Sequence, residues 1–160
     1  MRLALAALIF GGSLAQTNLV PVLRIGTVTP DVSLILTVLV GLRKGPEAGC
    51  LLGFAMGLIL DAAAGGLVGA QALTKAAAGF GVGLLGRRFW IHHPVVQVGG
   101  LVLLTLAEGL GRFALLQLFH FPPALVEVMR DAIVPQALYN GFLGSPVVLV
   151  LAVTQARRGS

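Results

Sequence analysis

Long apolar stretches, separated by short charged or proline-containing pieces, make up most of the chain. They run over about residues 3–20, 30–42, 46–61, 67–86, 94–119 and 132–154. Charged residues are 11% of the sequence and hydrophobic residues 57%, whereas a soluble domain has about 25% charged residues. Because about 20 consecutive apolar residues form a membrane-crossing helix, the pattern predicts an all-α integral membrane protein. We expect one polytopic domain over residues 1–160, folded as a compact bundle of about six transmembrane helices.

The second stretch has the clearest start signal and is also the shortest. Thr29 is suited to cap a helix, Pro30 to occupy its first position and Asp31 to face its positive end. At about 1.5 Å per residue, residues 30–42 span about 20 Å, less than the hydrocarbon core of about 30 Å. The helix therefore either includes preceding residues or begins inside a recess lined by protein. The sequence leaves five and six crossings both open.

Basic residues indicate the orientation of the helices. If all six stretches cross the membrane, Arg24 and Arg130 lie on one side, and the other side carries Arg2, Arg43, Lys44, Arg87, Arg88, Arg157 and Arg158. The side richer in basic residues is normally cytoplasmic, so we expect a multi-pass protein with a cytoplasmic C-terminus. With five crossings the balance is the same, and only the N-terminus changes sides. The net charge of +5 is thus mainly an orientation signal, because separate pairs of arginines make no nucleic-acid-binding face.

Small residues recur every four positions through the third stretch. Gly49, Gly53 and Gly57 share one helix face, and Asp61 and Gly69 continue the spacing across the following turn. Such faces let two helices approach closely in lipid. We favour packing within the chain, although a membrane helix of another protein would use the same chemistry. The same pattern predicts similar contacts for Ala7, Gly11 and Ala15, and for Gly79 and Gly83.

Single residues mark turns and helix ends elsewhere. The negative end of the third helix disfavours a carboxylate, so we expect Asp61 to begin the turn into the fourth helix. Its side chain would accept hydrogen bonds from N–H groups around Gly65 and Gly66. In the last stretch, Pro135 fits the first helical turn, and Pro146 lies inside the helix, where it predicts a kink.

Ionisable side chains well inside the apolar stretches are the strongest indication of a site. Lys75 lies in the fourth stretch, and Glu108 and Arg112 lie one turn apart in the fifth, where they can pair. Counted at about 1.5 Å per residue, Lys75, Glu108 and Asn140 reach similar depths, about 12 to 16 Å below the outer helix ends. We expect a buried polar layer there. It is either a clasp that pairs costly charges, which we favour, or the lining of a pathway for an ion or small molecule.

Few residues suggest catalysis or metal binding. Cys50 has no second cysteine with which to pair, and His92 and His93 have no carboxylate or cysteine at a ligand spacing. The serines and carboxylates are scattered, with no arrangement that would activate a nucleophile. We therefore expect no enzyme activity, no cofactor and no metal site.

Two segments carry a family resemblance. Residues 29–86, TPDVSLILTVLVGLRKGPEAGCLLGFAMGLILDAAAGGLVGAQALTKAAAGFGVGLLG, place Pro-Asp before a short helix, then a basic turn and a glycine-laced helix that ends in Leu-Asp. Residues 134–158, VPQALYNGFLGSPVVLVLAVTQARR, form a proline-entered last helix with a Tyr-Asn pair, a further proline and a basic tail. Together with the length and the number of apolar stretches, these segments resemble the rod shape-determining protein MreD family.

The resemblance implies a non-enzymatic scaffold subunit of the bacterial cell-elongation complex in the inner membrane. Besides membrane lipid, the implied partners are MreC, RodA, a class B penicillin-binding transpeptidase and MreB, whose filaments the complex links to peptidoglycan synthesis. The family is also distantly similar to the substrate-binding membrane subunits of energy-coupling-factor vitamin transporters, which supplies an alternative function. Lys75 and Glu108 match no motif of the family, so the resemblance assigns them no role.

Overall fold

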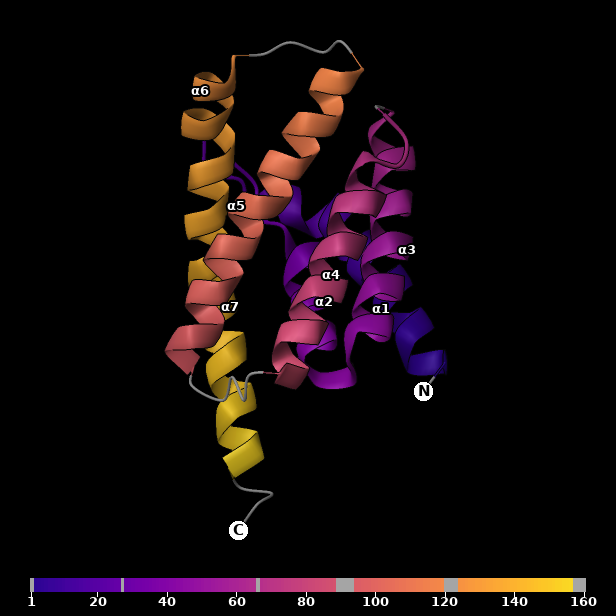
Figure 1. The fold of residues 1–160 in the computed structure, drawn as a ribbon, viewed down its shortest axis with the longest axis vertical. Coiled ribbons are helices and arrows are strands. Elements are labelled where there is room, and N and C mark those ends of the chain that lie inside the picture. Colours follow the sequence, from indigo (N-terminus) through magenta and orange to yellow (C-terminus); the bar gives the residue numbers. More distant parts are fainter. Residues whose placement is uncertain (1, 27, 66, 89–93, 120–123, 157–160) are drawn as a thin grey trace.

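A computed structural model describes residues 2–26, 28–65, 67–88, 94–119 and 124–156. Within these ranges the chain is helical and has no strand beyond an isolated bridge between Ile25 and Val28 (Figure 1). The helices are α1 (Arg2–Leu14), α2 (Val32–Lys44), α3 (Pro46–Ala64), α4 (Ala70–Arg88), α5 (Pro94–Leu118), α6 (Leu125–Val128) and α7 (Val134–Ala156). Short π and 3-10 segments join some of them: η1 (Ala15–Leu19), η2 (Val20–Leu23) and η3 (Met129–Ile133).

The expected fold class, an all-α membrane protein built as a helical bundle, is confirmed. Within the described part of the chain, three helical runs are long and apolar enough to cross a membrane, judged by length and composition: Leu5–Leu23, Pro46–Ala64 and Val95–Leu118.

Some helix ends differ from those expected. α2 begins at Val32 because Asp31 has a non-helical backbone (φ −105°, ψ 83°) and acts as the N-cap. α3 continues past Asp61 to Ala64, where Gly65 (φ 65°) ends it in a left-handed conformation. Gly69 (φ 104°) then precedes α4. Positive φ angles are unstrained for glycine, so these two glycines fix where the turn between α3 and α4 lies.

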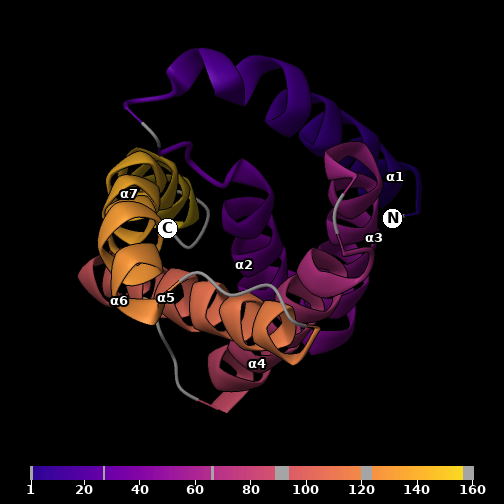
Figure 2. The same ribbon diagram turned by 90° about the horizontal axis from the view of Figure 1, so that it is seen from above.

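The helix α2, which has 13 residues, lies at the centre of the bundle. Seen from above, it is surrounded by α1, α3, α4, α5 and α7 (Figure 2), and it contacts each of them. A helix start and the irregular chain before it are tolerated at membrane depth only where protein covers them. The central position of α2 meets that condition and explains how a helix of 13 residues is accommodated.

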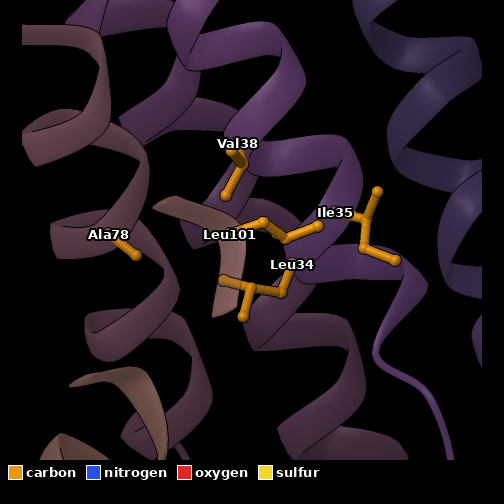
Figure 3. Packing of buried hydrophobic residues seen from close by; sticks show 5 residues of the cluster. All are labelled: Leu34, Ile35, Val38, Ala78 and Leu101. Atoms are coloured by element: carbon orange, nitrogen blue, oxygen red, sulfur yellow. The ribbon is translucent and has the colours of Figure 1, made fainter. Parts of the chain in front are cut away.

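The apolar core forms where α2 meets its neighbours. Leu34, Ile35 and Val38 of α2 pack with Ala78 of α4 and Leu101 of α5 (Figure 3). Leu34 is fully buried and Leu101 is 2% exposed. The cluster therefore joins helices from both halves of the sequence.

The glycine face of α3 lies against α4. A Cβ added at Gly57 would lie 2.5 Å from the Cα of Ala72, and one added at Gly49 would lie 2.5 Å from the carbonyl oxygen of Gly79. At Gly53 it would collide with the carbonyl of Lys75. These glycines thus allow the two helix backbones to touch, and α4 occupies the face that another protein's helix would need.

The prediction that α1 packs closely through small residues spaced four apart is wrong. Ala7 and Gly11 are exposed, and a Cβ at Gly11 would have no atom within 4 Å. α1 instead turns the neighbouring Gly12 toward Met56 of α3 and Leu36 of α2. The four-residue spacing identifies a small-residue face, but it does not say which side of the helix meets the bundle. For Gly79 and Gly83 the expected contact forms, against Gly49 and Pro46 of α3.

Each of two prolines follows a π turn. The N–H of Val20 bonds to the carbonyl of Ala15 just before Pro21, and the N–H of Val134 bonds to that of Met129 just before Pro135. Proline has no N–H to donate and crowds the preceding turn, and a π turn is one way in which a helix absorbs such a change of register. Pro135 lies in the first turn of α7, as expected, and α7 continues through Pro146.

Candidate functional site

The candidate site is built around the start of α2. Asp31 Oδ1 accepts hydrogen bonds from the backbone N–H of Leu34 at 2.9 Å and from the hydroxyl of Ser33 at 2.5 Å. Asp31 is thus the N-cap and Val32 the first helical residue, so the expected roles of Thr29 as cap and Pro30 as first helical residue are each wrong by two positions. Oδ1 alone serves the cap, which leaves Oδ2 free to meet another group.

Side chains from distant helices satisfy the backbone before α2. The carbonyl of Pro30 accepts a hydrogen bond from Gln16 of η1 (3.0 Å), and that of Thr29 accepts one from Gln136 of α7 (3.0 Å). Gln16 Oε1 also accepts the N–H of Val32 (2.8 Å). Unpaired backbone groups are costly away from water. These glutamines therefore fix the path of the chain into α2.

Lys75 of α4 places its ammonium group against Asp31. The Nζ atom lies 2.5 Å from Asp31 Oδ2 and 3.5 Å from Glu108 Oε1 of α5. Lys75 is fully buried, and Asp31 and Glu108 are 4% and 3% exposed. Such charges are stable in a low-dielectric interior only when they are paired, so the position of each depends on the others.

Asn140 of α7 completes the site. Its Oδ1 accepts the backbone N–H of Asp31 at 2.7 Å, and its Nδ2 donates to the hydroxyl of Thr105 at 3.3 Å. We call Asp31, Lys75, Glu108 and Asn140 the polar clasp. It ties the start of α2 to α4, α5 and α7.

The structure brings together most of the polar layer expected from the sequence. Lys75, Glu108 and Asn140 lie in one cluster, whereas Arg112 makes no ion pair with Glu108 in the described part of the chain. The expected pairing of Glu108 with Arg112 is therefore wrong, because the Glu108 carboxylate turns to α4, where Lys75 and the Thr74 hydroxyl (3.0 Å) lie. The closest partner of Lys75 is Asp31, for which the sequence predicts only a role at a helix start.

Asp61 forms a second polar contact, at the start of α4. Its Oδ2 accepts backbone N–H groups from Gly69 (2.8 Å), Gln71 (3.1 Å) and Ala72 (3.2 Å). Asp61 accepts hydrogen bonds as expected, but its donors among the described residues lie at the start of α4 rather than at Gly65. Gly66, which is also among the expected donors, is outside the described residues. A carboxylate at a helix N-terminus also interacts favourably with the helix dipole.

Replacing Asp61 with alanine is expected to destabilise the protein by about 1 to 3 kcal/mol, because buried N–H groups lose a charged acceptor. Asparagine at the same position keeps an acceptor oxygen and should lose less. Thermal unfolding of the detergent-purified variants measures both, with Glu127→Ala as a control for loss of an exposed carboxylate. Equal stability of Asp61→Ala and the control would contradict this role.

The arrangement suits holding helices together more than chemistry. Among the described residues, no group of three or more His, Cys, Asp or Glu side chains is placed to hold a metal ion. The polar groups of the clasp are directed mainly at one another, and the bonds join elements distant in sequence. The clasp therefore accounts for the costly ionisable residues as parts of the fold.

Comparison with known proteins identifies one family. The family described as rod shape-determining protein MreD matches residues 2–155, which is almost the whole chain. Neither the curated proteins nor the solved structures give a match. The extent of the family match decides the assignment: the chain belongs to the MreD family of rod shape-determining membrane proteins.

Proposed function

We propose that this protein is a non-enzymatic scaffold subunit of the cell-elongation complex in the bacterial inner membrane. It acts with MreC and helps to link MreB filaments to peptidoglycan synthesis by RodA and a class B penicillin-binding transpeptidase. The observation that carries the proposal is the family match over residues 2–155.

The internal architecture supports a scaffold role. Close backbone contact between α3 and α4, and a polar clasp that joins four elements, favour a bundle with a fixed shape. A transporter subunit needs several polar groups that remain available to a substrate. Here the amide and hydroxyl groups nearest Lys75 bond to other parts of the chain.

The proposed topology places the C-terminus in the cytoplasm. The start of α1, the basic turn after α2 and the ends of α4 and α7 lie at the same end of the bundle (Figure 1). Arg43 and Lys44 close α2, and Arg87 and Arg88 close α4. The positive-inside rule makes this end cytoplasmic, which agrees with six passes through the membrane.

Removing the protein from the bacterium that encodes it tests the proposed function. Rod-shaped cells should become wide or round, and a plasmid copy of the wild-type gene should restore rods. A Gly81→Leu copy should also restore them, because Gly81 has open space around it. Cells that keep their rod shape, width and pattern of wall synthesis without the protein would contradict the proposal.

A further inference from the structure

The charges of the polar clasp do not balance. Lys75 contributes one ammonium group, whereas Asp31 and Glu108 contribute two carboxyl groups. Lys75 Nζ is 1 Å closer to Asp31 than to Glu108, at 2.5 Å against 3.5 Å. Asp31 also accepts two hydrogen bonds at the helix start. The positive charge of Lys75 is therefore largely committed to Asp31, and Glu108 is the less neutralised of the two.

Only one of the two Glu108 carboxylate oxygens has a donor among the described residues. Its Oε2 atom is buried and has no hydrogen-bond partner among the described residues. Its Oε1 atom lies 3.0 Å from the hydroxyl of Thr74, but that hydroxyl lies 2.9 Å from the carbonyl oxygen of Ala70 as well. A hydroxyl has one hydrogen, so the two acceptors compete for it. A buried anionic oxygen without a donor or cation is costly.

We propose that Glu108 Oε2 is the binding site of one monovalent cation, Na⁺ or a proton, which neutralises the polar clasp. A single positive charge makes up the deficit and gives the orphan oxygen a partner. The Glu108 side chain is 1% exposed, so the ion must be small. A divalent ion would bring more charge than the clasp lacks, beside the ammonium group of Lys75.

Other charged groups near α5 do not remove the need for this cation. On α5 itself, Arg112 is half-buried and forms no ion pair with Glu108 within the described ranges. On η3, Arg130 pairs with Asp131 at 2.8 Å, and both are exposed. On α7, the hydroxyl of Tyr139 donates to the carbonyl of Leu23 at 2.7 Å. On α4, Lys75 faces Glu108, and its nearer partner is Asp31 at the start of α2.

The test is thermal unfolding of the purified full-length protein in detergent, in two series. One replaces choline with Na⁺ at constant ionic strength and pH, and the other lowers the pH at constant Na⁺. We expect the unfolding midpoint to rise in one series, which identifies the ion. At ion concentrations above the dissociation constant, each tenfold rise in the concentration of the ion should lower the unfolding equilibrium constant by up to tenfold.

Matched variants assign the effect to Glu108. Glu108→Gln removes the charge while keeping the shape of the side chain, so its unfolding midpoint should no longer depend on the ion. Glu127→Gln changes an exposed carboxylate, and its midpoint should keep the wild-type dependence on the ion. Arg112→Gln should strengthen it by removing a nearby positive charge. A wild-type midpoint that is flat in both series would overturn the proposal, as would an equal dependence in Glu108→Gln.

A second measurement covers the case in which Glu108→Gln does not fold. Amide hydrogen exchange of the wild-type protein, with and without the ion, should slow around Lys75 in α4 and Glu108 in α5. Slowing that is confined to other helices would place the ion elsewhere and overturn the assignment.

Discussion

Lys75→Met is expected to cost about 3 to 5 kcal/mol of stability, because it leaves two buried carboxyl groups without their ammonium partner. Methionine has nearly the length of lysine, so the loss is one of charge rather than packing. Domains of this kind have a total stability of about 5 to 15 kcal/mol. The loss is therefore a large share of the total stability, and we expect less folded protein in the membrane than for the wild type.

Membrane-inserted protein level and the unfolding midpoint measure this effect. Lys44→Met is the matched control, since Lys44 is exposed at the end of α2. Combining Lys75→Met with Asp31→Asn and Glu108→Gln should recover much of the loss, because a neutral buried set is often as stable as a charged one. Asparagine also retains the N-cap oxygen. A fully stable Lys75→Met protein would contradict the polar clasp.

The second large effect is expected for Gly57→Leu. A Cβ at Gly57 would lie 2.5 Å from the Cα of Ala72 and 2.6 Å from its N, both backbone atoms of α4. Backbone cannot rotate away as a side chain can, so α3 and α4 must separate. We expect a loss at or above the usual cost of overpacking, which is about 1 to 3 kcal/mol.

Gly81→Leu provides the control for this substitution. Gly81 lies in α4, and a Cβ there would have no atom within 4 Å. The same change should be neutral or slightly stabilising, because glycine is a poorer helix former than leucine by up to about 1 kcal/mol. Thermal unfolding of both variants separates the two sites. Similar midpoints for Gly57→Leu and Gly81→Leu would show that α3 and α4 do not touch at Gly57.

The sequence predicts the helices well because apolar length is itself the requirement for crossing a membrane. The third helix and its glycine face follow from composition and spacing, since Gly49, Gly53 and Gly57 recur at the helical repeat. The ends are less well predicted, because Asp31 and Gly65 act through backbone geometry that tertiary contacts select.

The pairing of Lys75 with Asp31 is not among the contacts predicted from the sequence, for an identifiable reason. Asp31 is predicted only to start a helix, although a helix of 13 residues leaves about 10 Å of a hydrocarbon core of about 30 Å uncovered. Its start therefore lies about as deep as Lys75. Applying that depth to Asp31 would have placed the two charges at one level. The spacing of residues in the sequence does not predict that Glu108 turns toward Lys75 rather than Arg112, because the partner of Glu108 depends on how α4 and α5 pack.

The measurement that tests the scaffold role most directly is recovery of the tagged protein, at its native level and in mild detergent, with its bound partners identified by mass spectrometry. A tagged membrane protein of unrelated function is the control. We expect a bitopic coiled-coil protein of the MreC kind, together with wall-synthesis enzymes. Recovery of paired ATPases with a transmembrane coupling subunit, without wall-synthesis proteins, would contradict the scaffold role and indicate a transporter subunit.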